Sequence, residues 1–274
     1  MRRKFFKLFI CILLLVVTVS LPLFKVSINT SNLLTVISLF FAILVVFFIA
    51  TATTNYLRLQ SLIAEEDSGL IAVFNYCCII APGLREKIIK VIDKYAIAAL
   101  SFELTDYVWE TQREFNDVCK VVEEVNFSDS RGEELIQSLY EKKNSLYQTR
   151  QEVALVARRI VTPSHWMLLI ILAVFLDILI LTTRDGGLFS YLITGALLIT
   201  TYLSLALLHD VDSNRFLEQV LSYENSQQIF KAIGTQKYYE ESIIKSGRIP
   251  KPKENYRTGY YRSYDDNSTR EVKI

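Results

Sequence analysis

Residues 33–50 read LLTVISLFFAILVVFFIA, an apolar stretch without a charged side chain. A helix needs about 20 such residues to cross a bilayer. Three further runs of similar length are Phe5–Phe24, Trp166–Thr182 and Leu188–Leu208. Backbone polar groups in lipid must be satisfied within the segment, so each run is predicted to be a helix. The sequence therefore predicts an all-α, polytopic membrane protein embedded in the lipid bilayer.

The four runs form two closely spaced pairs, separated by residues 25–32 and 183–187. Connections this short predict two antiparallel transmembrane hairpins with a helical cytoplasmic region between them. The predicted organisation is a first transmembrane hairpin at 1–55, a cytoplasmic helical region at 56–163, a second transmembrane hairpin at 164–210, short cytoplasmic helices at 211–247 and a flexible tail at 248–274.

Basic residues near the ends of the runs predict the orientation, because they favour the cytoplasmic side of a membrane. The hairpin tips carry only Lys25 and Arg184, whereas the other ends carry a larger set: Arg2, Arg3, Lys4, Lys7, Arg58, Arg150, Arg158, Arg159 and Arg215. Both termini are predicted to be cytoplasmic, in a plasma (inner) membrane. The rival interpretation, a cleaved secretory signal at residues 1–24, lacks an A-x-A-like cleavage site after the run.

Composition and motif searches exclude several classes of function. The net charge is +1, and residues 51–163 carry more acidic than basic side chains, so no nucleic-acid partner is expected. The sequence lacks zincin, hydrolase and nucleotide-binding motifs, and its cysteines and histidines have no metal-ligand spacing. No catalytic residue, cofactor or metal site is therefore predicted. The acidic runs Glu65–Asp67 and Glu123–Glu124 are interpreted as solvated helix faces.

Two patterns organise the cytoplasmic region. After Pro82, apolar residues recur at three- and four-residue steps, which predicts a helix with one buried face: Leu84, Ile88, Ile92, Tyr95, Ala99 and Phe102. A second helix from Glu133 carries Leu139, Leu146, Val153 and Ile160 at seven-residue spacing, for which packing within a bundle and an oligomer seam both stay open. Pro163 is expected in the first turn of the third membrane helix.

A family resemblance rests on the order of these segments and on two motifs. Leu84-Arg85-Glu86 is followed by Lys94-Tyr95 in the cytoplasmic helices, and Arg158-Arg159-Ile160-Val161-Thr162-Pro163-Ser164-His165-Trp166 opens the second hairpin. Over roughly residues 5–215 the chain resembles the bestrophin-like membrane family. It departs from the family in the turn after the last membrane helix, where His209-Asp210-Val211-Asp212-Ser213 lacks a proline. The resemblance implies a helical subunit similar in plan to bestrophins, which are pentameric anion channels.

Asp177 interrupts the third membrane run. A charged side chain in mid-membrane costs on the order of 3 kcal/mol or more, so it needs a partner, water or a proton. Counting back from the hairpin tip places Asp177 near Ser190 or Thr194, and Arg184 could approach it from the exposed end. A structural hydrogen bond between helices and an ion or proton pathway both stay open.

Four phenylalanines form two adjacent stripes at seven-residue spacing on the second membrane helix: Phe40, Phe41, Phe47 and Phe48. A resemblance to bestrophins would make them an apolar pore constriction, which can gate by dewetting, although membrane phenylalanines more commonly pack against lipid or helices. Packing against lipid or a neighbouring helix is the alternative.

The residues and the resemblance together predict a non-enzymatic, homo-oligomeric ion channel, anion-conducting by the bestrophin resemblance. The alternative is a membrane scaffold or sensor whose cytoplasmic helices bind a protein partner. A hydrated pore would favour the channel, whereas a dry membrane bundle with a stoichiometric soluble partner would favour the scaffold.

Overall fold

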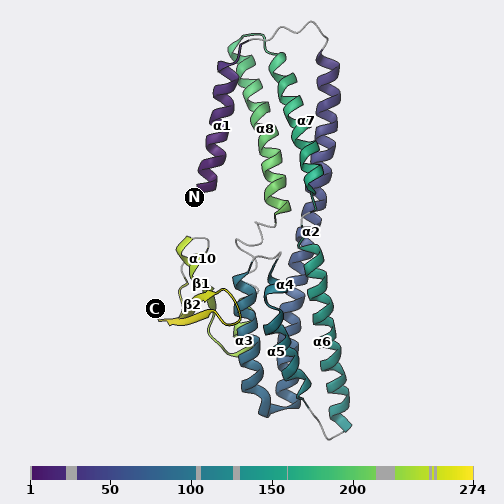
Figure 1. Cartoon of the computed structure of the whole chain (residues 1–274), viewed down its shortest axis with the longest axis vertical. Coiled ribbons are helices and arrows are strands. Elements are labelled where there is room, and N and C mark those ends of the chain that lie inside the picture. The colour runs from purple at the N-terminus through teal and green to yellow at the C-terminus, as the bar shows by residue number, and fades with distance from the viewer. Residues whose placement is uncertain are drawn as a thin grey trace. The chain divides into compact units, whose positions relative to one another are not determined.

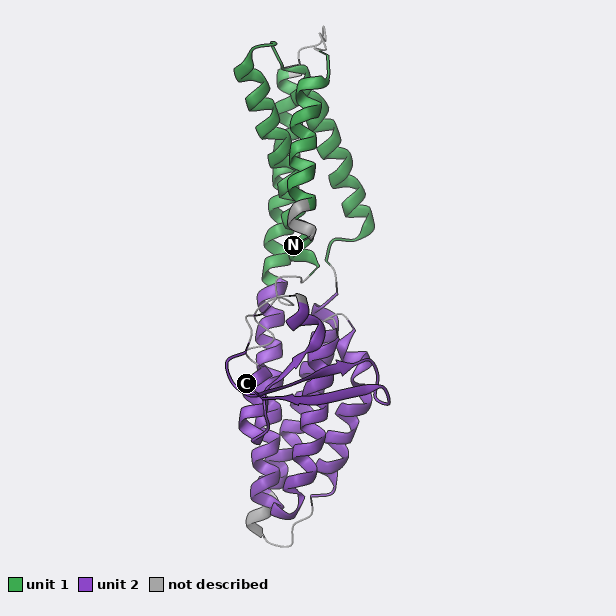
Figure 2. Ribbon diagram, turned by 90° about the vertical axis from the view of Figure 1, so that its left-hand side faces the viewer, with its two compact units in different colours: residues 1–54, 159–213 green, residues 55–158, 214–274 purple. Residues whose placement is uncertain are grey.

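The structure, a computed structural model, consists of two compact units (Figure 2). It describes residues 2–22, 30–102, 106–125, 130–158, 160–213, 226–246, 249 and 252–273. The first unit comprises residues 1–54 and 159–213, and the second comprises residues 55–158 and 214–274. Each unit is therefore assembled from segments that are distant in sequence. Lys25, Arg159 and Arg215, which contribute to the predicted orientation, lie outside the described residues.

Four helices build the described part of the first unit: α1 (Arg2–Ser20), the N-terminal part of α2 (Thr30–Ile80), α7 (Pro163–Thr182) and α8 (Leu188–Asp212). Among the described helices, α2, α7 and α8 are long and apolar enough to cross a membrane, whereas the described apolar part of α1, Phe6–Ser20, is shorter. Helix α2 has 51 residues, more than twice the length that spans a bilayer. Its apolar part is residues 33–50, and charged residues follow from Arg58 onward.

The helices of the first unit pack in the order α1, α8, α7 and α2 (Figure 1). Gly195 of α8 allows a close approach, because a Cβ there would lie only 2.7 Å from Leu15 Cδ2 of α1. The first two helices, expected to pack on each other as a hairpin, thus have α8 and α7 between them. Adjacency in the chain did not predict this order, because α1 packs on α8, a helix that is distant in sequence.

The start of α7 is fixed by a proline and by a carboxylate. Pro163 is the first residue of α7, as predicted, and Thr162 precedes it in an extended conformation. Asp212 Oδ1, at the end of α8, accepts hydrogen bonds from the backbone N–H groups of Ile160 at 2.9 Å and Val161 at 3.0 Å. The turn that lacks the expected proline therefore has a different role, which is to hold the segment that leads into α7.

The second unit is a helical bundle with a small sheet. Its described helices are the C-terminal part of α2, the 3₁₀ turn η1 (Pro82–Leu84), α3 (Arg85–Ser101), α4 (Tyr107–Glu110), α5 (Gln112–Glu123), α6 (Ser130–Val156) and a helical segment at 226–233. The predicted face of α3 is confirmed, because Ile88, Ile92 and Tyr95 are buried. The seven-residue pattern of α6 is also buried inside this unit, which favours bundle packing over an oligomer seam: Leu139, Leu146 and Val153.

Three strands follow the helices: β1 (Tyr238–Glu240), β2 (Tyr256–Tyr261) and β3 (Asn267–Val272), with the short helix α10 (Glu241–Ser246) after β1. The sheet order is β1-β2-β3, β1 running parallel and β3 antiparallel to β2. The prediction of an exclusively helical chain is therefore wrong in this part. Residues 248–274, predicted as a flexible tail, contain two of the strands.

Polar contacts to the bundle explain why this tyrosine-rich segment folds. Arg257 of β2 donates to both carboxylate oxygens of Asp93 on α3, at 2.7 and 2.6 Å. Tyr261 donates to the buried carboxylate of Glu114 on α5, and the Tyr264 hydroxyl donates to Asp117 at 2.7 Å. The composition offered few aliphatic groups for a core, but these hydrogen bonds and the aromatic rings replace them.

We predict that Gly259→Ala separates β3 from β2. A Cβ at residue 259 would lie 1.8 Å from the backbone oxygen of Ser268, so the strands must move apart. The expected cost is about 1–3 kcal/mol, as for other overpacked sites. Hydrogen exchange should show lost protection in β3 while the helices stay protected. Gly83→Ala is the matched control, because a Cβ there meets nothing within 4 Å; equal protection of β3 in both variants would contradict the prediction.

Candidate functional site

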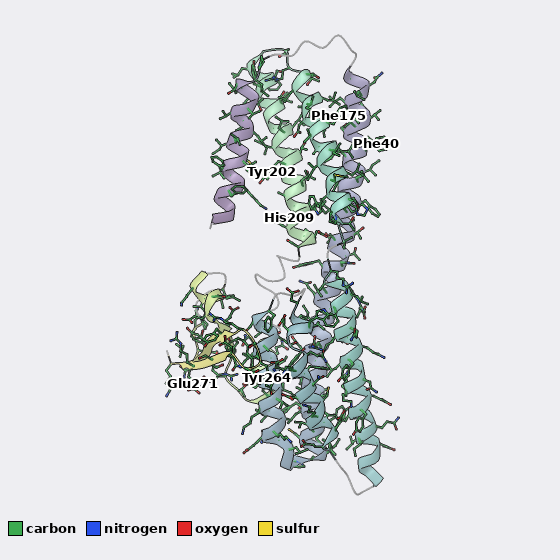
Figure 3. All side chains as sticks on the ribbon, in the orientation of Figure 1. Phe40, Phe175, Tyr202, His209, Tyr264 and Glu271 are labelled. Atoms are coloured by element: carbon green, nitrogen blue, oxygen red, sulfur yellow. The ribbon has the colours of Figure 1, made fainter. Side chains whose placement is uncertain are left out.

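Helix α2 presents two different faces in the first unit. Phe41 and Phe48 are 6% and 7% exposed and pack in a cluster with side chains of α7 and α8. Phe40 and Phe47 are 58% and 60% exposed. Figure 3 shows Phe40 directed away from the neighbouring helices. The structure thus separates the two predicted stripes, one of which packs inside the unit while the other lies on its outer surface.

The outer stripe is regular and apolar. Its members follow alternating three- and four-residue steps and are all exposed, and we call them the α2 stripe: Leu33, Val36, Phe40, Ile43 and Phe47. This spacing keeps one helix face in line with a partner along its length. Residues 30–54 contain no charged side chain. The α2 stripe is therefore suited to contact with lipid, with another helix or with a narrow apolar passage.

Asp177 lies between α7 and α8, with its carboxylate beside the side chain of Thr201. Its Oδ1 atom is buried and has no hydrogen-bond partner among the described residues. The predicted neighbour Thr194 is buried elsewhere along α8. Asp177 is five residues from the end of α7, but Thr201 is thirteen from the start of α8, so the two helices are offset by about two turns. Counting from the hairpin tip missed this offset.

Arg184 is 7% exposed and binds the end of α1 instead of Asp177. Its guanidinium donates to the carbonyl oxygens of Thr18, Leu21 at 3.3 Å and Pro22 at 2.9 Å. The last carbonyls of a helix lack intrahelical partners and carry partial negative charge, so a cation is favourable there. The role of Arg184 in the structure is therefore to fix α1 against the loop between α7 and α8.

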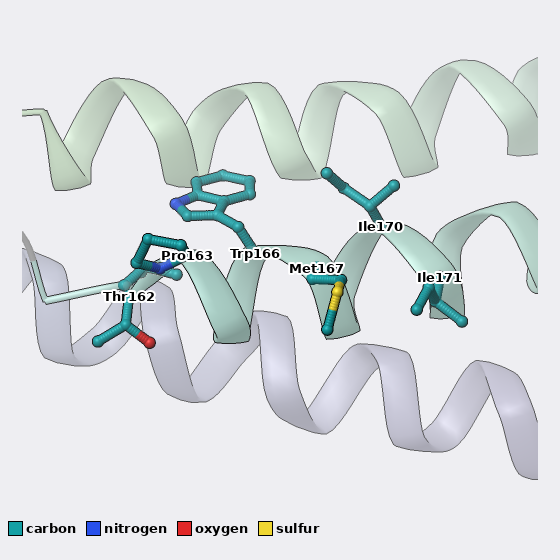
Figure 4. A pocket seen from close by; sticks show the side chains of 7 residues that line it. Thr162, Pro163, Trp166, Met167, Ile170 and Ile171 are labelled. Carbon is teal, nitrogen blue, oxygen red and sulfur yellow. The ribbon is translucent and has the colours of Figure 1, made fainter.

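A groove of about 680 Å³ runs along the start of α7 (Figure 4). It is lined by Val161, Thr162, Pro163, Trp166, Met167, Ile170 and Ile171. The Thr162 hydroxyl is already engaged, at 2.8 Å from Ser164 Oγ and 3.0 Å from His165 Nδ1. The remaining lining is apolar apart from the indole nitrogen of Trp166. The groove is therefore an apolar contact surface and not a constellation of reactive groups.

A charged pair is buried in the second unit. Glu66 of α2 and Arg150 of α6 are 4% and 2% exposed, and Arg150 Nη1 lies 3.4 Å from Glu66 Oε1. Tyr95 and Tyr107 each donate a hydrogen bond to Glu66, and Arg150 donates to the carbonyl oxygen of Val108 at 2.8 Å. Burial raises the pKa of both tyrosines well above the ordinary value, so the phenols keep the protons that they donate.

The interpretation of Glu65–Asp67 as a solvated helix face is wrong at its centre. Glu65 is exposed, but Glu66 is buried. The spacing of buried residues on α2 contains the missed signal, since Leu62 and Leu70 each lie four residues from Glu66. A carboxylate in phase with a buried apolar face requires a buried partner.

Metal and thiol chemistry find no support among the residues that the structure describes. No group of His, Cys, Asp and Glu side chains there could hold a metal ion. The cysteines are free thiols: Cys11, Cys77, Cys78 and Cys119. The features with functional potential are therefore the α2 stripe, the Asp177 site and the buried charges of the second unit.

We predict that Arg150→Met destabilises the second unit by about 3–5 kcal/mol, because it leaves Glu66 buried without a countercharge. Arg58→Met is the matched control, since Arg58 of α2 pairs with Glu152 of α6 at the surface, where such a pair contributes less than about 1 kcal/mol. Thermal unfolding of both purified variants checks the difference. Equal unfolding midpoints for the two variants would show that the buried ion pair contributes no more to stability than the surface pair.

Comparisons with known proteins agree with this architecture. A model of the bestrophin-like domain matches residues 8–214. The fold is similar to that of a membrane protein carrying a single substitution, with a TM-score of 0.60 and 11% identity over 86% of this chain and 100% of that chain.

Two solved structures are variants of a bacterial bestrophin homolog from Klebsiella pneumoniae. One has a TM-score of 0.58 and 10% identity, covering 84% of this chain and 99% of its own. The other has a TM-score of 0.55 and 11% identity, covering 85% and 100%. No curated protein matches the sequence. Because the domain match covers most of the chain and the apolar helices agree with it, the chain belongs to the bestrophin-like family of integral membrane proteins.

Proposed function

We propose that this protein is the subunit of a homo-oligomeric ion channel in which the α2 stripe faces the conduction pathway. The α2 stripe carries the proposal, because it is an uncharged row of exposed apolar side chains on a membrane helix. The packing of α2 within its own unit is already provided by other residues, including Phe41 and Phe48. Copies arranged around an axis would bring their stripes together. Membership of the bestrophin-like family supports a bestrophin-type channel.

Within such a pathway, Phe40 and Phe47 would form two apolar rings, separated by about two helical turns. An apolar constriction can gate by dewetting. The edge of an aromatic ring carries partial positive charge, so rings that present their edges to the axis favour an anion over a cation. We therefore propose that the channel conducts anions and that Phe40 and Phe47 form its constriction.

The proposed topology has four membrane spans with both termini in the cytoplasm of a plasma (inner) membrane. Helix α1 has 19 residues and is about 28 Å long, close to the hydrocarbon thickness of a bilayer. Lys7 near its start pairs with Asp210 near the end of α8, which supports the same side of the membrane for these two ends. In this topology the second unit is the cytoplasmic region.

A scaffold or sensor function is the second candidate. Trp109 and Leu155 of the second unit are 64% and 65% exposed, so each offers apolar surface that a bound protein would bury. Tryptophan is also enriched among residues that contribute most to protein interfaces. A cytoplasmic protein bound through Trp109 would support this function in place of conduction.

Ion flux tests the channel directly. Purified protein in liposomes should give chloride flux that exceeds potassium flux, and Phe40→Ala with Phe47→Ala should raise the flux severalfold or shorten its closed periods by widening the constriction. Phe41→Ala with Phe48→Ala is the matched control, which should lower the unfolding temperature because these rings are buried. Absence of flux from folded, oligomeric protein would favour the scaffold. Equal flux in the two double variants would show that the α2 stripe does not line the pathway.

Asp177→Asn separates the two interpretations of the membrane carboxylate. Asp177 lies beside Thr201 and is not part of the α2 stripe, so we propose a structural contact between α7 and α8. The variant should keep its oligomer mass and its chloride flux within about twofold, because an amide can retain a hydrogen bond to the Thr201 hydroxyl. Altered conductance or altered pH response in an intact oligomer would instead assign Asp177 to the pathway.

A further inference from the structure

The helical segment 226–233 covers the side of α2 that carries Asp67. Asp67 Oδ2 accepts a hydrogen bond from the hydroxyl of Ser226 at 3.2 Å. Leu70, one turn further along α2, belongs to the same buried cluster as three residues of the segment: Ile229, Phe230 and Ile233. Packing of this segment therefore contributes to the burial of Asp67.

The charged and titratable groups near Asp67 lie on three helices, α2, α3 and α6. Glu66 and Glu65 are its acidic neighbours on α2, Tyr95 faces it from α3, and Arg150 of α6 is bonded to Glu66. Among the described residues, no lysine or arginine forms an ion pair with Asp67. An ionised Asp67 would thus lie in a partly buried place beside the Glu66 carboxylate, with the Ser226 hydroxyl as its hydrogen-bond donor.

Burial, and then the neighbouring charge of Glu66, raise the pKa of Asp67 to about 8 in the packed state, although the hydrogen bond from Ser226 acts in the opposite direction. A solvated aspartate has a pKa of about 3.9. At a pH between these two values, Asp67 is therefore protonated in the packed state and ionised when it is solvated.

We propose that Asp67 is a proton-dependent latch: segment 226–233 stays packed on α2 while Asp67 is protonated, and it detaches when Asp67 ionises. The consequence extends to the sheet. The Gln227 side chain donates to the carbonyl oxygen of Tyr238 at 2.7 Å and accepts from its backbone N–H at 3.2 Å, so the segment is bound to β1. Detachment would release the attachment of β1 together with the segment.

The pH range follows from the two protonation states. The packed state holds the extra proton, so detachment becomes more favourable as the pH rises from about 4 to about 8, by up to about tenfold per pH unit. Above about pH 8 both states are ionised, and the equilibrium becomes independent of pH.

Hydrogen exchange of the purified full chain at pH 5 to 9 tests the latch. After correction for intrinsic exchange, protection of 226–233 should fall severalfold per pH unit up to about pH 8 and then level off. Asp67→Asn should remove this dependence and keep the segment protected, because the amide has a similar shape and cannot ionise. Glu65→Gln is the matched control, since Glu65 is exposed and its loss should leave the pH profile unchanged.

Two results would overturn the latch. One is protection of 226–233 in the unaltered protein that stays constant from pH 5 to pH 8, which needs no variant to interpret. The other is an unchanged pH profile in Asp67→Asn, which would assign the titration to another group. Ser226→Ala serves as a second variant, because it keeps the titrating carboxyl and should therefore keep the pH dependence.

Discussion

The buried contact between Glu66 and Arg150 is the interaction on which the second unit depends. A buried ion pair is tolerated only when the remaining hydrogen-bond donors and acceptors of both side chains also have partners. Tyr95 of α3, Tyr107 of α4 and the backbone of Val108 provide those partners. The contact therefore links α2, α3, α4 and α6 at one point. It also engages Arg150, and no lysine or arginine among the described residues forms an ion pair with the adjacent carboxylate of Asp67.

The apolar helices were predictable because a membrane span requires a long, uninterrupted run of apolar residues, which is visible in the local sequence. Length and hydropathy located α2, α7 and α8, and Pro163 marked the start of α7. The buried face of α3 was equally readable, since its period matches a helix that packs on one side. The family resemblance over roughly residues 5–215 is confirmed by a domain match over residues 8–214.

Contacts between distant segments were not predictable in the same way. Helix α1 contacts α8 through Leu15 and Gly195 and contacts Arg184 through its last carbonyl groups, and each of these pairs joins residues that are far apart in sequence. The neighbour of Asp177 depends on the offset of α7 relative to α8 along their axes, and counting residues from the hairpin tip does not give that offset. The strands were not predicted because side chains of β2 form hydrogen bonds to α3 and α5, which lie far away in the chain.

Helix α2 belongs to both units, and this continuity constrains how its length can change in evolution. Phe47 of the α2 stripe and Glu66 of the buried pair lie on one uninterrupted helix. Inserting one residue between them would rotate one relative to the other by about 100°. The α2 stripe and the charge pair would then point in different directions around the helix axis relative to one another. Changes of seven residues, close to two turns, nearly preserve the angle between these two features around the helix axis.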